Sequence, residues 1–207
     1  MYAVMTLLAD AIESGVRRAG RAQREAALAA AEPRTCLELT AGVTALSRLR
    51  ARATGSPVTA PLSGRACVWY AVHVHEWYAH WRPGPLGPAK EERQLLVAEL
   101  ASGLLPMTDE TGTVHVDPTG ARIDLDPPAF EDFEGRTDAS GALTARMADL
   151  FGAPLPPPRH GKLTLGYLVE EWTVAKDDEL TAIGHPETRE GQIVLAGTRR
   201  RQLRLTR

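Results

Sequence analysis

The sequence predicts a mainly β domain with a barrel-like architecture, of which the OB type is one example, and an α+β class overall. Short apolar stretches alternate with a period of two from residue 35 onward, and turn-forming residues separate them. Only two stretches have the periodicity of a helix, so most of the core is expected to come from strands. We expect an N-terminal helical segment over residues 1–34, a β domain over 35–198 and a basic tail over 199–207.

Residues 2–31 predict an amphipathic helix. The stretch is rich in Ala, Arg and Glu, and Pro33 is expected to end it. Its apolar side chains recur at helical spacing: Val4, Leu7, Leu8, Ala11, Ile12, Val16 and Ala19. Such a helix packs on its own domain or on a partner helix. The alternative is a helix lying on a membrane surface, which its arginines would suit.

The β domain is expected to contain several short strands and one internal helix. The period-two stretches cover residues 35–46, 65–81, 93–100, 112–117, 121–126, 168–174, 178–184 and 192–197. Clusters of Gly, Pro, Asp and Thr between them predict tight turns. The internal helix is predicted over 140–152, opened by Asp138 or Ser140 and closed by Gly152.

Charge and hydropathy limit the classes of partner and the location that we expect for this protein. The chain of 207 residues has 24 Lys and Arg against 26 Asp and Glu, a net charge of −2, so we expect no nucleic-acid partner. The basic residues of 199–207 are expected to form a solvated end. No stretch approaches the ~20 apolar residues that cross a bilayer. We therefore expect a cytoplasmic or membrane-associated protein.

The residues also suggest a specific alternative function, the binding of a metal ion. His73 and His75 would share one face of a strand, and His80 would be the candidate for a third ligand. Their strand is otherwise apolar, however, so we expect these histidines to lie where it emerges towards solvent. We predict no bound metal and no cofactor.

Nothing in the sequence predicts catalysis. Ser63 and Cys67 do not lie in a nucleophile motif, and an apolar run makes a thiol inert. The acidic residues Asp109, Asp117, Asp124 and Asp126 adjoin turns, where Asp commonly hydrogen-bonds the local backbone. We expect a protein that is not an enzyme.

The order of several stretches resembles a known family. "LTAGVTAL" is followed by "SPVTAPLSGRACVWYAVHV", then "LLPMTDETGTVHVDPTGARID" and "YLVEEWTVAKDDELTAIG". Together, over residues 36–197, they are similar to the GIDE domain, also called the BAM ("beside a membrane") domain. That domain is known from MULAN-type organelle E3 ubiquitin ligases and from bacterial membrane proteins. The Ala, Arg, Gly and Pro content suits a bacterial source.

The resemblance implies a non-catalytic interaction module that acts beside a membrane or in a multiprotein assembly. The chain has two cysteines, Cys36 and Cys67, which are too few to supply the zinc ligands of a RING. An accessory role in ubiquitin-like conjugation is the alternative. The partner is expected to be a protein that contacts Trp77, Tyr78 and Trp81. The alternative is that these aromatics cap the barrel and contact no partner. Residues 2–31 are the candidate membrane contact.

Overall fold

The computed structural model describes residues 26, 29–40, 42–80, 92–119, 121–125, 127–135, 141–155, 162–197 and 203–207. Residues 26, 29 and 30 are helical, and the rest of the helix predicted over 2–31 lies outside the described residues.

Five strands close into a barrel. They are β2 (Ser47–Ala53), β7 (Leu105–Asp109), β8 (Gly112–Val116), β12 (Glu179–Arg189) and β13 (Gln192–Ala196). Neighbouring strands are antiparallel except β8 and β13, which are parallel, and the antiparallel pair β2–β12 completes the ring. The prediction of a barrel-like, mainly β domain is confirmed, and five strands is the size of an OB barrel.

The barrel is filled by alternating strand residues. Leu49, Met107 and Leu195 are fully buried inside it. Trp69 enters the same core from β5, and its indole Nε1 donates a hydrogen bond to the carbonyl oxygen of Gly103 at 3.0 Å. Because a buried indole N–H needs an acceptor, this bond ties the adjoining sheet to the chain that enters β7.

Three short strands extend the barrel sheet. Strand β1 (Glu32–Arg34) pairs with β2 in parallel, and β14 (Arg204–Thr206) pairs with β12 and with β9 (Arg122–Asp124). The prediction of a solvated C-terminal end is wrong for this part of the chain, because Leu203 and Leu205 are fully buried in the barrel core. The two leucines alternate with polar residues as a half-buried strand requires, and the neighbouring arginines obscured that pattern.

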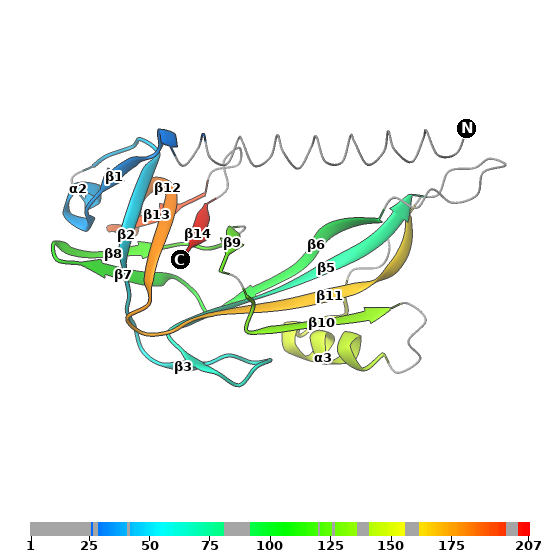
Figure 1. The fold of residues 1–207 in the computed structure, drawn as a ribbon. Coiled ribbons are helices and arrows are strands. Elements are labelled where there is room, and N and C mark those ends of the chain that lie inside the picture. The colour runs from blue at the N-terminus through cyan, green and yellow to red at the C-terminus, as the bar shows by residue number, and fades with distance from the viewer. Residues whose placement is uncertain are drawn as a thin grey trace, which may run out of the picture.

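A second, four-stranded sheet extends away from the barrel (Figure 1). Its order is β10 (Phe130–Gly135), β11 (Lys162–Val174), β5 (Trp69–His80) and β6 (Glu92–Ala101), and all its pairs are antiparallel. Strand β11 continues through a short turn into β12 of the barrel, so the chain passes directly from one sheet to the other. The strand predicted over 65–81 is interrupted at Val68, because β4 (Ala66–Cys67) pairs with β3 (Val58–Thr59) as a separate hairpin.

Helix α3 (Ala142–Phe151) covers one face of the four-stranded sheet. Its Leu143 and Met147 pack with Val72, Val74 and Val169. The predicted internal helix is confirmed, and it ends as expected at Gly152, whose φ of 67° is left-handed. The predicted N-cap at Asp138 or Ser140 is wrong, because the N-cap is Gly141, which has no side chain to form a cap hydrogen bond; residues 136–140 themselves lie outside the described residues.

The strand predicted over residues 35–46 is wrong, because this stretch begins with the helix α2 (Cys36–Thr40). Thr35 and Glu38 form a capping box: the Thr35 N–H donates to Glu38 Oε2 at 2.8 Å, and the Glu38 N–H donates to Thr35 Oγ1 at 3.3 Å. Asp109, from the β7–β8 turn, accepts the Cys36 N–H at 2.8 Å. These bonds satisfy the free N–H groups of the first turn and outweigh the period-two pattern.

Candidate binding surface

The four-stranded sheet has one face opposite α3, which we call the outer face. Strand register assigns its residues, since partners that lie directly opposite each other in a ladder share a face. The described outer-face residues are Gln94, Leu96 and Glu99 from β6; His73, His75 and Trp77 from β5; Leu168, Glu170 and Trp172 from β11; and Glu131 and Phe133 from β10.

The outer face exposes large apolar side chains. Phe133 is 48% exposed and Leu96 is 38% exposed. Trp77 is half-buried and meets the edge of the Phe133 ring, with 6.1 Å between ring centroids. Its Nε1 is buried and makes no hydrogen bond to the described residues. The exposed ring of Phe133 and the Trp77 ring beside it form an apolar surface of the kind that a bound partner covers.

Two histidine–carboxylate pairs lie towards the barrel end of the outer face. His75 Nε2 is 3.2 Å from Glu170 Oε2, and His73 Nε2 is 3.5 Å from Glu99 Oε1. His73 is only 6% exposed and packs edge-on against Trp172 at 4.9 Å. Its Nε2 is a buried polar atom that lies next to Glu99 but makes no hydrogen bond within the described structure.

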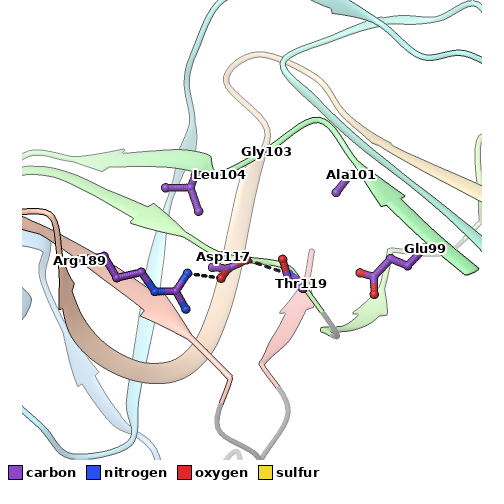
Figure 2. A pocket seen from close by; sticks show the side chains of 7 residues that line it. All are labelled: Glu99, Ala101, Gly103, Leu104, Asp117, Thr119 and Arg189. Atoms are coloured by element: carbon purple, nitrogen blue, oxygen red, sulfur yellow. Dashed lines mark hydrogen bonds and ion pairs between the residues drawn. The ribbon is translucent and has the colours of Figure 1, made fainter. Parts of the chain in front are cut away.

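A hollow of about 380 Å³ lies between this end of the outer face and the barrel. Figure 2 shows the residues that line it, which are Glu99, Ala101, Gly103, Leu104, Asp117, Thr119 and Arg189. The Glu99 carboxylate and the Thr119 side chain point into the same space from β6 and from the segment after β8 (Figure 2). Leu104, which is 40% exposed, supplies an apolar wall.

Ion pairs fix one side of the hollow. The Arg189 guanidinium donates to Asp117 and to Glu187, and the Thr119 N–H donates to Asp117 Oδ1 at 3.0 Å. Burial opposes the charge of Asp117, but the bonds from Thr119 and Arg189 outweigh it and hold the pKa of this carboxyl below its usual range. Asp117 and Arg189 therefore stay charged at neutral pH.

Among the described residues, the carboxylates of Glu99 and Asp117 and the guanidinium of Arg189 line the hollow, and Glu187 pairs with Arg189 beside it. The described lining therefore carries charges of both signs. The Thr119 hydroxyl is placed next to Asp117, which is held ionised by its other partners, and the histidines pair with Glu99 and Glu170 instead. The described side chains that line the hollow therefore do not form a nucleophile with its base.

The sequence-predicted contact residues do not form one surface. Trp77 lies on the outer face, whereas Tyr78, the next residue of the strand, is buried on the α3 face. Trp81 lies outside the described residues. Phe133, Leu96 and Glu99 share the outer face with Trp77, and sequence reasoning missed them because only strand pairing brings β6 and β10 beside β5.

The histidines of the metal alternative are only partly brought together. His73 and His75 share a face, with 5.8 Å between ring centroids, but each lies beside a different carboxylate. His80 ends β5, and its side chain lies outside the described residues. Across the part of the chain that the structure describes, no group of three or more His, Cys, Asp or Glu side chains is arranged to hold a metal ion.

The other residues that the sequence analysis considered for catalysis are not part of the hollow: two are buried thiols, and Asp109 and Ser63 make hydrogen bonds that hold the fold. Burial raises the pKa of the Cys36 thiol to about 11 and also raises the pKa of Cys67, so both are poor nucleophiles. Asp109 caps α2 and accepts the Thr111 N–H at 2.7 Å within its own turn. Ser63 donates its backbone N–H to Glu171 at 2.9 Å. Asp124 ends β9, and Asp126 lies outside the described residues.

Comparison with known proteins gives one match. The model of the GIDE family, described as E3 ubiquitin ligase, matches residues 103–204. The matched residues hold β7 to β13 and the start of β14, and this match confirms the resemblance to the GIDE family there. The first block of the resemblance, around β5, precedes the matched residues. No curated protein and no solved structure matches the chain.

None of the helices in the described residues is both long enough and apolar enough to span a membrane.

Proposed function

We propose that this protein is a non-catalytic protein-interaction module of the GIDE type, which uses the outer face of the four-stranded sheet to contact a protein partner. It acts beside a membrane or within a multiprotein assembly, in the cytoplasm or attached to the membrane. The observation that carries the proposal is the pairing of the exposed Phe133 ring with Trp77 on this face.

The chemistry of this surface fits recognition of another protein. Aromatic side chains contribute much of the binding free energy in protein interfaces because they bury a large area at a small entropic cost. Polar side chains such as Gln94 and Glu131 border the aromatic pair, as they do at the rim of an interface. The partner is expected to present apolar side chains that pack on Phe133 and Trp77.

Site-specific cross-linking tests the proposal. A photo-reactive phenylalanine analogue at position 133 should cross-link a defined partner in cells, and the added substitution Trp77→Ala should reduce the yield several-fold. The matched control carries the analogue at Leu37, which is 63% exposed on α2, well away from the outer face. Equal yields at positions 37 and 133 would contradict the proposal, provided that thermal unfolding shows the variants to be folded.

A second candidate is an accessory role in ubiquitin-like conjugation. It rests on the description of the matching family as E3 ubiquitin ligase. Two buried cysteines leave no RING within these residues, so such a role would consist in binding a ubiquitin-like protein or a conjugating enzyme. Titration of ¹⁵N-labelled protein with ubiquitin and with a charged conjugating enzyme should shift the NMR signals of amide groups on the outer face. The absence of shifts at 0.5 mM of either protein would reject this role.

A further inference from the structure

We propose that the edge of the four-stranded sheet formed by β6 binds an extended segment of the protein partner, which adds to this sheet as a further strand. The inference rests on the proposed function, in which the partner is a protein, and it names the conformation and the chemistry of the segment that the partner presents. It concerns the backbone of β6, whereas the proposed function concerns side chains of the outer face.

The backbone of β6 is the first argument. Strand β6 lies at one edge of the four-stranded sheet (Figure 1), and among the described strands it pairs only with β5. In an antiparallel ladder, alternate residues direct their N–H and C=O groups away from the paired strand, so an edge strand presents a row of hydrogen-bonding groups. Such a row is complementary to a chain in the extended conformation.

The side chains of β6 are the second argument, and they define the chemistry of the added segment. Residues 94–101 are rich in apolar side chains, and none of them is buried. Leu96 is 38% exposed on the outer face, and the half-buried Leu95 lies on the α3 face opposite Glu76. Because an added strand would cover both flanks of β6, its side chains are expected to be apolar at successive positions.

The charges on the two edges of the sheet are the third argument. The opposite edge strand, β10, exposes Glu131 and Asp132, and charged side chains on an edge oppose pairing with another strand. From Gln94 to Ala98, by contrast, β6 carries no charged residue. Strand addition is therefore opposed at β10 and favoured at β6.

A β-bulge at Val97 decides where on β6 the segment pairs. The residues on either side of it, Leu96 and Ala98, lie opposite consecutive residues of β5, which leaves Val97 without a partner of its own. A bulge interrupts the ladder, so continuous pairing is expected over the regular run Glu92–Leu96. This run lies beside Trp77, and the added strand would extend the apolar surface of the outer face.

The test uses the peptide acetyl-Lys-Thr-Val-Ile-Val-Thr-Lys-amide, which has an apolar centre and strand-forming residues. Titrated into the ¹⁵N-labelled full chain, it should shift the NMR signals of the backbone amides of Gln94, Leu95 and Leu96 and slow the hydrogen exchange of alternate ones. The amides of Glu131 and Asp132 on the charged edge are the matched control, and their exchange should not change.

A chemical variant of the peptide tests the backbone contact. N-methyl groups on two adjacent central residues remove N–H groups from both edges of the peptide while the side chains stay the same. This peptide should bind at least about tenfold more weakly, because each lost backbone hydrogen bond costs about fivefold. Equal binding of the two peptides would overturn the inference.

Two proline variants test the same contact from the protein. Adjacent residues of an edge strand direct their N–H groups to opposite sides, so either Gln94→Pro or Leu95→Pro removes only an N–H of the open side. That variant should keep a dispersed ¹H–¹⁵N spectrum and lose peptide binding, and wild-type affinity in it would overturn the inference. If both variants unfold, the N-methylated peptide decides the question.

A second copy of the chain is the competing occupant of this edge. Sedimentation without peptide should show a monomer, and self-association that slows exchange of the same β6 amides would overturn the inference. If the peptide does not bind while Trp77-dependent cross-linking through position 133 persists, strand addition is excluded and the proposed function stands. The reverse result would exclude the outer face as the contact and leave strand addition supported.

Discussion

Glu171 illustrates how single carboxylates organise this fold. It lies on β11, is fully buried, and accepts the backbone N–H groups of Leu62 and Ser63 at 2.8 and 2.9 Å. These bonds attach the turn that precedes β4 to the α3 face of the sheet. A carboxylate bound by two N–H groups is satisfied, whereas an unpaired charge at this depth would be strongly unfavourable.

Glu171→Ala should therefore lower the free energy of unfolding by about 2–4 kcal/mol, because it leaves two buried N–H groups unpaired. Glu171→Gln should cost less, since its amide oxygen can still accept one of the two bonds. Urea unfolding followed by circular dichroism measures both. The control Glu179→Ala removes an exposed ion pair with Arg50 and should change stability by less than about 1 kcal/mol. Equal losses in Glu171→Ala and Glu179→Ala would refute this role.

Glu134 makes the stability depend on pH. It caps α3 from β10, accepting the N–H of Leu143 at 3.1 Å and that of Thr144 at 2.9 Å. Burial raises its pKa, but the hydrogen bonds from Thr144 and Leu143 outweigh burial and bring the pKa below its usual range. A carboxylate with a lowered folded-state pKa stabilises the fold above its unfolded-state pKa of about 4.3. This contribution disappears as the pH falls through the folded-state value.

Unfolding measured between pH 7 and pH 3 should show this directly. The wild type should lose more stability on acidification than Glu134→Gln, and the two curves should converge at the acid end. Other carboxyls contribute equally to both proteins, so the difference isolates Glu134. Glu131→Gln, at an exposed neighbour on β10, should follow the wild type. Parallel curves for the wild type and Glu134→Gln would contradict the cap.

At the scale of elements, β14 joins the end of the chain to the barrel. Leu205 is fully buried in the barrel core and lies opposite Ala182 of β12. Leu205→Ala should destabilise the protein by about 2–5 kcal/mol, because the cavity cannot fully collapse between two paired strands. Thr206→Ala, on the next residue, should cost less than about 1 kcal/mol. Thermal unfolding measures both effects. Equal unfolding temperatures for the two variants would contradict a role of β14 in stabilising the fold.

Element boundaries show what local patterns can and cannot predict. Helix α3 was predictable because its apolar residues recur at helical spacing and Gly152 marks its C-terminal end. Helix α2 was missed although Thr35 and Glu38 are a capping-box pair, because the alternating apolar residues suggested a strand. The candidate site was predictable only at Trp77, His73 and His75, which are near neighbours in sequence. Its other members come from strands whose register no local pattern encodes.

At the scale of the whole molecule, the fold is larger than the part matched by the GIDE family. Strand β2 lies between β7 and β12 and closes the barrel, and β5 lies between β6 and β11, yet both precede residue 103. A fragment of residues 103–204 would leave the barrel open and β11 without its main partner.

This fragment is expected to remain unfolded by itself, because exposed strand edges and half of a core do not offset the entropy of folding. The measurement is the dispersion of its ¹H–¹⁵N spectrum, with the full chain as the reference. Adding residues 1–102 as a separate fragment should restore dispersion if the two parts complement each other. A dispersed spectrum from residues 103–204 alone would show that the matched part is an autonomous domain.

Local patterns are enough to predict the mainly β fold, the internal helix and the family resemblance, because periodicity, turn residues and block order are local properties of the chain. Which strands close the barrel, where the basic C-terminal stretch lies, and which side chains accompany Trp77 on the outer face follow only from the folded arrangement. Those outcomes depend on pairing between strands far apart in sequence, such as β2 with β12 and β5 with β11. Register between distant strands follows from the packing of the whole core, and no short stretch of sequence contains it.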